Sequence, residues 1–206
     1  MKEITKIVLT GGPCAGKTSA QEYIRKAFEE KGYVVFFVPE CATILINSGI
    51  DQKVCGGYDL FEKPVFSMQV ALEKCYGETA QEVEAEKVLI VCDRGTMDIK
   101  AFIDAERFDE IAGCYETDEE SELHKYDAVF HLVTAAKGAE EFYSSKNNSA
   151  RIETLEEAAK NDDRIIAAWE KHPNLVIIEN RGSFDDKMND LISAIDAFLG
   201  SKNNKQ

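Results

Sequence analysis

Residues 11–19 constrain the fold of this chain more than any other segment. They read Gly-Gly-Pro-Cys-Ala-Gly-Lys-Thr-Ser and lie between an apolar run and a segment with helical periodicity. Two glycines separated by four residues and followed by Lys-Thr have the spacing of a phosphate-binding P-loop, in which backbone N–H groups surround phosphate oxygens. The sequence therefore predicts a nucleotide site formed by Gly11, Gly12, Pro13, Cys14, Ala15, Gly16, Lys17, Thr18 and Ser19.

The last residues of this motif have individual predicted roles. Lys17 is expected to reach the β- and γ-phosphates and to take part in catalysis, and the Thr18 hydroxyl is expected to bind Mg²⁺. Thr18 also begins the predicted helix, so the positive end of the helix dipole faces the anion. The alternative is a glycine-rich turn that happens to precede a lysine, and the flanking strand and helix patterns disfavour it.

Charge and cysteine usage limit the partners and the compartment. With 24 Lys and Arg against 38 Asp and Glu, the net charge is −14. Such a chain repels the phosphates of nucleic acids and anionic membranes, so we expect neither as a partner. The six cysteines are dispersed without a C-x-x-C pair, which favours a reduced, cytoplasmic protein. The sequence shows neither a signal peptide nor an apolar run of transmembrane length.

Apolar segments alternate with helical segments along the chain. Short apolar strands separated by helices form parallel sheets that are covered on both faces. We therefore expect an α/β, three-layer P-loop NTPase fold with a five-stranded parallel sheet, in a single domain of residues 1–200 followed by a polar tail, 201–206. The longest predicted helix, 60–86, is expected to break near Pro64 and Gly77. The predicted strands are 4–9, 33–38, 88–92, 127–133 and 175–178.

Ligands of such sheets bind where the strands end, so the residues after each strand are candidates for the site. Asp93 ends the third strand and is expected to hold Mg²⁺ through water, opposite Thr18. Arg94 could bind a substrate phosphate or hydroxyl and assist catalysis, or form a surface ion pair. Glu40 follows the second strand as a candidate general base and substrate ligand, or as an ordinary helix-start residue. Gln69 could contact a nucleobase or be a plain polar helix position.

Cations in the last third of the chain are candidates for a lid over the nucleotide. Residues 137–164 mix lysines and arginines with polar residues, a composition typical of a mobile lid that brings charge over the transferring phosphoryl group. Arg151 and Arg164 are the predicted catalytic lid cations, and Arg151 is also expected to contact the nucleotide. A solvated loop and helix face would have the same composition. Arg181, after the fifth strand, is predicted to border the adenine, although a turn explains it equally.

Several segments together resemble a known family. Thr10 to Thr18, Phe-Val-Pro-Glu at 37–40, Cys-Asp-Arg-Gly at 92–95 and His-Leu-Val-Thr-Ala at 131–135 resemble the AAA-like P-loop ATP-binding domains of the NadR/TRPL-translocation-defect type. The resemblance extends to Glu-Phe-Tyr at 141–143, Asn-Asn at 147–148, Arg151 and Ala-Trp at 168–169, and it covers residues 4–199. The family is similar in layout to the P-loop kinases of nucleosides and nucleotides.

The resemblance implies phosphoryl transfer. In deoxynucleoside kinases a Glu after the second strand is the base, an acid–Arg pair follows the third strand, and a Gln on the preceding helix contacts the nucleobase. Residue by residue, these roles fall on Glu40, Asp93 with Arg94, and Gln69. The ribosylnicotinamide kinase portion of NadR suggests the same chemistry on another nucleoside; the adenylyltransferase portion of NadR has no counterpart in this sequence.

Two functions of different class are compatible with these residues. The first is a kinase that uses ATP, or GTP, with Mg²⁺ to phosphorylate a nucleoside-like or other small hydroxyl acceptor. The second is a regulatory ATPase or GTPase switch that signals through its lid. The Asn-Lys-x-Asp guanine signature is absent, which disfavours a Ras-like GTPase. A kinase requires a second pocket beside Glu40 and Gln69, whereas a switch does not.

Overall fold

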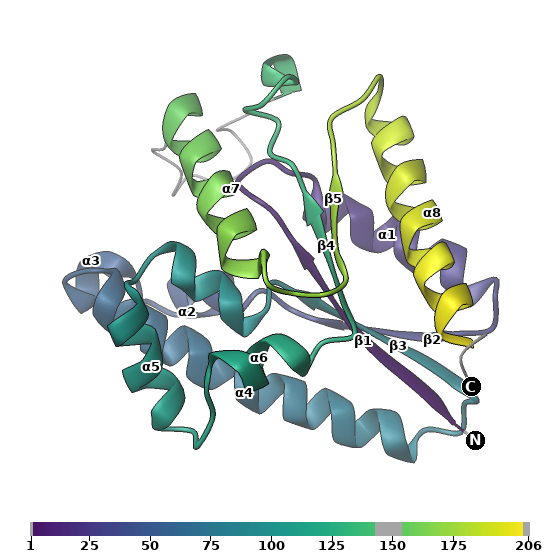
Figure 1. Ribbon diagram of the computed structural model, residues 1–206, viewed down its shortest axis with the longest axis horizontal. Coiled ribbons are helices and arrows are strands. Elements are labelled where there is room, and N and C mark those ends of the chain that lie inside the picture. The colour runs from purple at the N-terminus through teal and green to yellow at the C-terminus, as the bar shows by residue number, and fades with distance from the viewer. Residues whose placement is uncertain (1, 143–153, 204–206) are drawn as a thin grey trace.

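The structure is a computed structural model that describes residues 2–142 and 154–203. Its centre is a sheet of five parallel strands in the order β2-β3-β1-β4-β5 (Figure 1). Helices flank the sheet, so the predicted α/β fold with a five-stranded parallel sheet is confirmed. The strands are β1 (Glu3–Thr10), β2 (Val34–Val38), β3 (Lys87–Asp93), β4 (Ala128–Leu132) and β5 (Leu175–Ile178).

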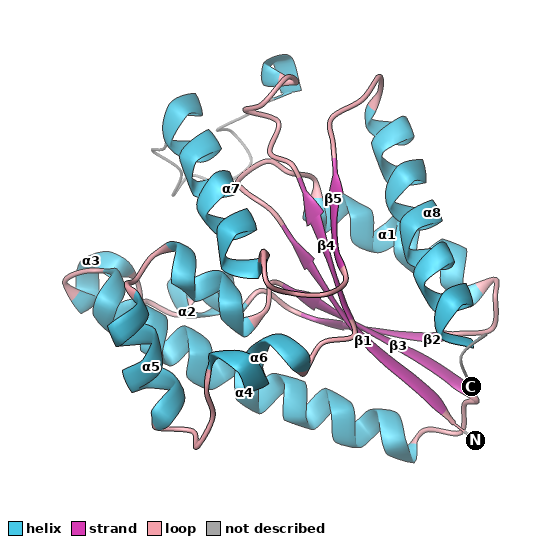
Figure 2. Ribbon diagram, viewed as in Figure 1, coloured by secondary structure: helices cyan, strands magenta, loops and turns pink. Residues whose placement is uncertain are grey.

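Helical segments connect the strands (Figure 2). No helix among the described residues combines the length and the apolar character that crossing a membrane requires. The α-helices are α1 (Lys17–Glu29), α2 (Cys41–Asn47), α3 (Gln52–Cys55), α4 (Tyr58–Glu82), α5 (Ala105–Gly113), α6 (Glu119–His124), α7 (Leu155–Trp169) and α8 (Phe184–Asn203), and the 3₁₀ helices are η1 (Thr96–Ala101) and η2 (Glu140–Phe142).

The two faces of the sheet are packed against different helices. Because successive side chains of a strand point to opposite faces, Ile7 and Leu9 of β1 join the cluster under α1 and α8, while Val8 joins the cluster under α4 to α7. Figure 1 shows α1 and α8 together on one side of the strands. Both faces are apolar, which explains why the central strands β3 and β4 are near-continuous runs of buried residues.

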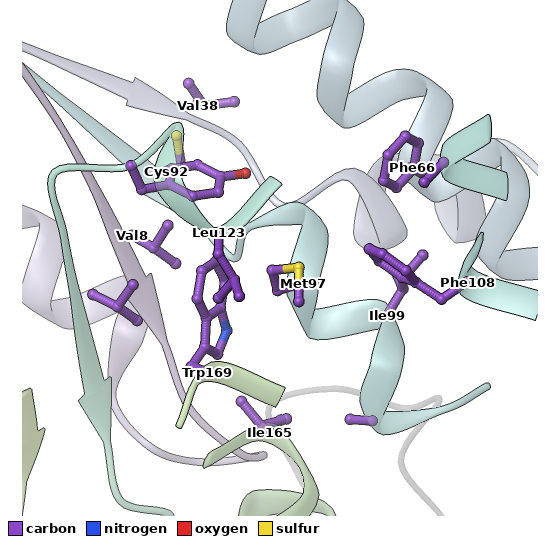
Figure 3. Close-up of a cluster of buried hydrophobic side chains, with 14 of the residues drawn as sticks. Val8, Val38, Phe66, Cys92, Met97, Ile99, Phe108, Leu123, Ile165 and Trp169 are labelled. Atoms are coloured by element: carbon purple, nitrogen blue, oxygen red, sulfur yellow. The ribbon is translucent and has the colours of Figure 1, made fainter. Parts of the chain in front are cut away.

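Trp169, the last residue of α7, is the largest fully buried side chain. Figure 3 shows its indole beside Met97 of η1 and near Val8 of β1. The indole Nε1 donates to Oδ2 of Asp98 at 3.2 Å. The start of α7 is fixed separately by a capping box between Thr154 and Glu157. Helix α7 is thus anchored at its C-terminal end to η1, the segment that directly follows β3.

Two predictions about helices were wrong, one about breaks within a helix and one about where a helix ends. Helix α4 runs without a break from Tyr58 to Glu82, although the sequence predicts interruptions near Pro64 and Gly77. Pro64 removes a bond to the carbonyl of Leu60, and Leu60 is exposed, so water can satisfy that carbonyl. Gly77 lies inside the helix with a conformation that any residue could adopt. Helix α8 extends to Asn203, past its predicted end at Leu199.

Candidate active site

The predicted P-loop connects the end of β1 to the start of α1. Gly11 has φ 144° and Gly16 has φ 96°, values that favour glycine. A Cβ atom at Gly11 would also lie 2.2 Å from the carbonyl oxygen of Leu132. In the described structure no side chain caps the first turn of α1 and no acidic residue lies in that turn. The N–H groups at the start of α1 can therefore serve an anion.

A cavity of about 1540 Å³ includes most of the predicted site residues in its wall. Of residues 11–19, Gly11 and Gly12 are the two that do not contribute to this wall. Arg151 lies outside the described residues. The predicted residues that line the cavity are Pro13, Cys14, Ala15, Gly16, Lys17, Thr18, Ser19, Glu40, Gln69, Asp93, Arg94, Arg164 and Arg181.

Lys17 lies between the phosphate-binding loop and the acidic residues that follow β2 and β3. Its Nζ donates to the carbonyl oxygen of Gly11 at 3.0 Å. Burial lowers the pKa of Lys17, and the neighbouring Arg94 lowers it further, while Asp93 and Glu40 oppose both effects. An ammonium group in this place can reach an anion bound by the loop and can offset the carboxylates behind it.

Asp162 of α7 braces the P-loop, a role that the sequence did not suggest. Its Oδ1 accepts the backbone N–H of Gly12 at 2.8 Å and lies 3.0 Å from Nε2 of His131, and its Oδ2 accepts from Nζ of Lys137 at 2.9 Å. Burial alone would raise the pKa of Asp162, but these hydrogen bonds lower it to about 2. Lys137, the first residue of the segment predicted as a lid, is thus paired with an acid of α7.

Lys187 of α8 supports the same loop from the opposite layer. Its Nζ donates to the carbonyl oxygens of Ala15 at 3.0 Å and Val133 at 2.6 Å, and to Oδ1 of Asn180 at 2.8 Å. Burial lowers the pKa of Lys187 to about 8. Helices from both faces of the sheet therefore hold the P-loop in place.

Asp93 offers an unsatisfied carboxylate oxygen beside the P-loop. Its Oδ2 accepts from Nε2 of Gln21 at 3.0 Å, whereas its buried Oδ1 has no hydrogen-bond partner among the described residues. Burial raises the pKa of Asp93, and Lys17 opposes this shift. Gln21 lies one turn after Thr18 on α1, so Asp93 faces the first turns of that helix. The carboxylate of Asp93 and the hydroxyl of Thr18 are ligands that suit hydrated Mg²⁺.

A metal ion at this position would need oxygen ligands from water and from the nucleotide in addition to those of the protein. In residues 2–142 and 154–203, no group of three or more His, Cys, Asp or Glu side chains gathers in a way that could hold a metal ion. Mg²⁺ commonly keeps several waters and uses one or two protein ligands together with substrate phosphates. Thr18 and Asp93, which both line the cavity, fit that pattern.

Arg94 links the carboxylates of Glu40 and Asp98. Its Nε donates to Oε1 of Glu40 at 2.6 Å, and its Nη1 donates to Oδ1 of Asp98 at 3.2 Å. Glu40 also accepts from the hydroxyl of Thr43 at 2.6 Å. Burial alone would raise the pKa of Glu40, but Arg94, Lys17 and Thr43 lower it to about 2. Glu40 is therefore an ionised, oriented carboxylate at neutral pH.

The amide of Gln69 is bonded within the protein. Its Nε2 donates to Oε1 of Glu73 at 2.8 Å and to the carbonyl oxygen of Arg94 at 3.3 Å, and its Oε1 accepts from Sγ of Cys41 at 3.1 Å. Gln69 thereby ties α4 to the turn after β3. Its contact with a nucleobase stays a prediction that would require these bonds to be exchanged.

Two further acids of the site were missed by sequence reasoning. Asp98 accepts hydrogen bonds from Arg94, Trp169, the N–H of Gly95 and the hydroxyl of Thr10. Its position four residues after Arg94 was the one available signal. Glu62 lines the cavity from α4, and no feature of the sequence distinguishes it from the many other glutamates.

A comparison with models of protein families agrees with this geometry. A family model described as an AAA domain matches residues 6–187, which is most of the chain. A search of curated proteins found no match. The matched region contains the P-loop, the second half of β1, the other four strands and the residues around Glu40 and Arg94. The family suggests nucleotide binding and NTPase chemistry, and the chain belongs to the AAA domain family of P-loop NTPases.

Proposed function

We propose that the protein is a kinase that transfers the γ-phosphoryl group of ATP, with Mg²⁺, to a hydroxyl group of a small acceptor. The observation that carries this proposal is the composition of the cavity wall. The P-loop forms one part of it, and residues of α2, α4 and η1 form another, next to Glu40. A kinase must hold an acceptor beside the γ-phosphate, whereas a switch does not need this second compartment.

The nucleotide part of the site supplies positive charge and N–H groups. The P-loop and the N-terminus of α1 would bind the phosphates, with Lys17 placed toward the γ-phosphate. Thr18 and Asp93 would hold Mg²⁺ directly or through water, and the unsatisfied Oδ1 of Asp93 supports this assignment. Mg²⁺ would neutralise charge that develops on the phosphate oxygens.

The acceptor part of the site supplies a base. The acceptor oxygen would attack the γ-phosphorus as the bond between phosphorus and the departing ADP oxygen breaks, and the hydroxyl proton would pass to the carboxylate of Glu40. A carboxylate with a pKa of about 2 is a weak base. Phosphoryl transfer passes through a loose transition state with little bond formation to the acceptor, so a well-placed weak base is sufficient. Arg94 keeps Glu40 ionised and oriented.

Arginines from the second half of the chain would complete the nucleotide site. Arg164 on α7 and Arg181 after β5 are exposed side chains that line the cavity. In this proposal Arg164 stabilises the transferring phosphoryl group and Arg181 borders the adenine. Arg151 would share the role of Arg164 and also contact the nucleotide, but it lies outside the described residues. GTP is the alternative nucleotide.

A regulatory NTPase without an acceptor is the second candidate, and one observation favours it. Asp162 connects α7 directly to the N–H of Gly12 in the phosphate-binding loop. A helix bonded to that loop can respond when a nucleotide binds, as in switch proteins. Such a protein would hydrolyse the nucleotide slowly and signal through the position of α7.

One experiment separates the two candidates. Purified protein is incubated with ATP and Mg²⁺ and screened against nucleosides, amino alcohols and other hydroxyl compounds, with ADP formation followed with and without each compound. The kinase predicts that at least one compound accelerates ADP formation and appears as its phosphorylated product. ADP release that no acceptor enhances would favour the switch. Lys17→Ala provides the control for contaminating ATPases.

A further inference from the structure

Glu62 is a buried acid in the part of the cavity assigned to the acceptor. Its helix, α4, contributes Phe61, Glu62, Val65, Phe66 and Gln69 to the cavity wall, at the spacing of one helix face. Glu62 is only 4% exposed. Burying a carboxyl group without a partner is costly, so such groups are nearly always paired.

Glu62 differs from the other buried acids in having no partner. Among the described residues its carboxyl group makes neither a hydrogen bond nor an ion pair. Glu73, on the same helix, contacts Lys6, Lys125, Tyr126 and Gln69. Asp98 and Asp162 each accept several hydrogen bonds. These other buried acids are paired within the protein, whereas Glu62 is unpaired within the described part of the chain and lines the cavity. This difference points to a ligand that pairs with Glu62.

Arg94 does not supply the missing partner, because its charge is already shared. Its Nε and Nη1 donate to Glu40 and Asp98. Burial raises the pKa of Glu62 to about 8, with Arg94 opposing this rise and the nearby charge of Asp98 adding to it. The three carboxyl groups of Glu40, Glu62 and Asp98 thus share one arginine, which leaves this part of the cavity short of positive charge.

Aromatic rings surround the same space. Tyr58 and Phe102 both line the cavity, and their rings stack with centroids 5.2 Å apart and planes 16° from parallel. Phe61 and Phe66 contribute further aromatic wall. Aromatic rings attract cations electrostatically, and a carboxylate among them strengthens the attraction. An uncharged hydroxyl compound would gain neither the electrostatic attraction of the rings for a cation nor an ion pair with Glu62.

We propose that the acceptor carries a protonated amine or another cationic nitrogen group, and that Glu62 binds this group at the aromatic end of the cavity; the inference rests on the proposed kinase function. The hydroxyl group of such an acceptor lies toward Glu40, and the nitrogen pairs with Glu62. A neutral analogue leaves Glu62 without a partner, so Glu62 determines specificity.

The test compares two probes of nearly equal shape, 2-phenylethylamine, which is cationic at neutral pH, and 2-phenylethanol, which is not. Their affinities are measured by calorimetry without nucleotide, on the wild type, on Glu62→Gln and on Glu78→Gln. Glu78 is a matched control on α4, because its side chain is 66% exposed. We expect the wild type and Glu78→Gln to bind the amine about tenfold more tightly than the alcohol or better. Glu62→Gln is expected to lose the difference.

Two further readouts sharpen the result. Ionisation of Glu62 by the bound cation should release a proton at neutral pH, which calorimetry in two buffers of different ionisation enthalpy detects; the alcohol should release none. Thermal unfolding verifies that Glu62→Gln is folded. Equal affinities of the two probes, no detectable binding of either, or an amine preference that survives Glu62→Gln would overturn the proposal. If the preference depends on Glu62 but no acceptor is phosphorylated, the cation site stands and the kinase proposal fails.

Discussion

The guanidinium of Arg94 donates to the carboxylate of Glu40 across the ends of two neighbouring strands, with 2.6 Å between Nε and Oε1. The parallel register of β2 and β3, in which Val38 is opposite Cys92, brings the residues that follow these strands together. Arg94 adopts the left-handed φ of 69°, which is rare for a side chain of this size. Its N–H donates to the carbonyl oxygen of Leu9 at 3.1 Å, which stabilises this conformation. Such local strain is frequent at functional sites.

Replacing Glu40 by Gln tests its proposed role as the base. The amide keeps the shape and can still accept a hydrogen bond from Arg94, but it cannot take a proton. We expect turnover with an accepted substrate to fall by about 10²-fold or more while the affinity for ATP changes little. Steady-state kinetics and direct nucleotide binding measure the two quantities. Normal turnover of Glu40→Gln would show that another group accepts the proton.

The contrast between Glu40 and Glu62 explains how far the sequence could predict the site. Glu40, Asp93 and Arg94 follow strands, and the carboxyl ends of parallel strands meet at one edge, so these residues could be placed without a structure. Glu62 lies within a long helix, where the sequence does not reveal which face borders a cavity. The hydrogen bond from Gly12 to Asp162 joins residues 150 positions apart, and the local patterns carried no information about it.

Replacing Lys17 by Ala tests the P-loop itself. A charge-assisted contact to a phosphate is worth about 1.5–3 kcal/mol, so we expect ATP to bind about tenfold more weakly or worse. Lys26→Ala is a matched control, because Lys26 is an exposed lysine in the last turn of the same helix. Titration with a fluorescent nucleotide measures both variants. Unchanged affinity of Lys17→Ala would contradict the nucleotide site.

Replacing Asp93 by Asn tests the metal assignment. The substitution preserves the size of the side chain and the bond from Gln21 while it removes the charge next to the unsatisfied oxygen. We expect the Mg²⁺ concentration needed for half-maximal activity to rise about 10- to 100-fold. Nucleotide affinity without Mg²⁺ should be maintained, since one repulsive charge is lost. An unchanged Mg²⁺ requirement would remove Asp93 from the metal site.

Asp162 should make the stability of the fold depend on pH. Its pKa falls from the ordinary value of 3.8 to about 2 in the folded protein. The unfolded chain therefore binds the proton more readily, and the stabilisation is fully present above about pH 4 and is lost as the pH falls toward 2. We expect Asp162→Asn to lose about 1–3 kcal/mol of unfolding free energy at neutral pH and to show a weaker acid dependence.

Asp163→Asn is the control for that measurement. Asp163 shares Lys137 with Asp162, but its side chain is 69% exposed, so its loss should cost less than about 1 kcal/mol. Urea unfolding at several pH values compares the two variants with the wild type. Equal effects of the two substitutions would mean that the brace on the P-loop contributes no more than a surface ion pair.

Replacement by alanine should have opposite effects at Gly11 and at Gly77. At Gly11 a Cβ atom would meet the carbonyl oxygen of Leu132 at 2.2 Å and the backbone has φ 144°, so Gly11→Ala must displace β4 or the P-loop. At Gly77 a Cβ atom would meet nothing within 4 Å, and alanine is the better helix former. We expect Gly11→Ala to abolish nucleotide binding and lower the melting temperature, and Gly77→Ala to stabilise the protein by about 0.5–1 kcal/mol. Thermal unfolding with and without ATP measures both. Normal ATP binding by Gly11→Ala would mean that the loop tolerates a different path from the one described, because the clash involves backbone that no rotamer change can relieve.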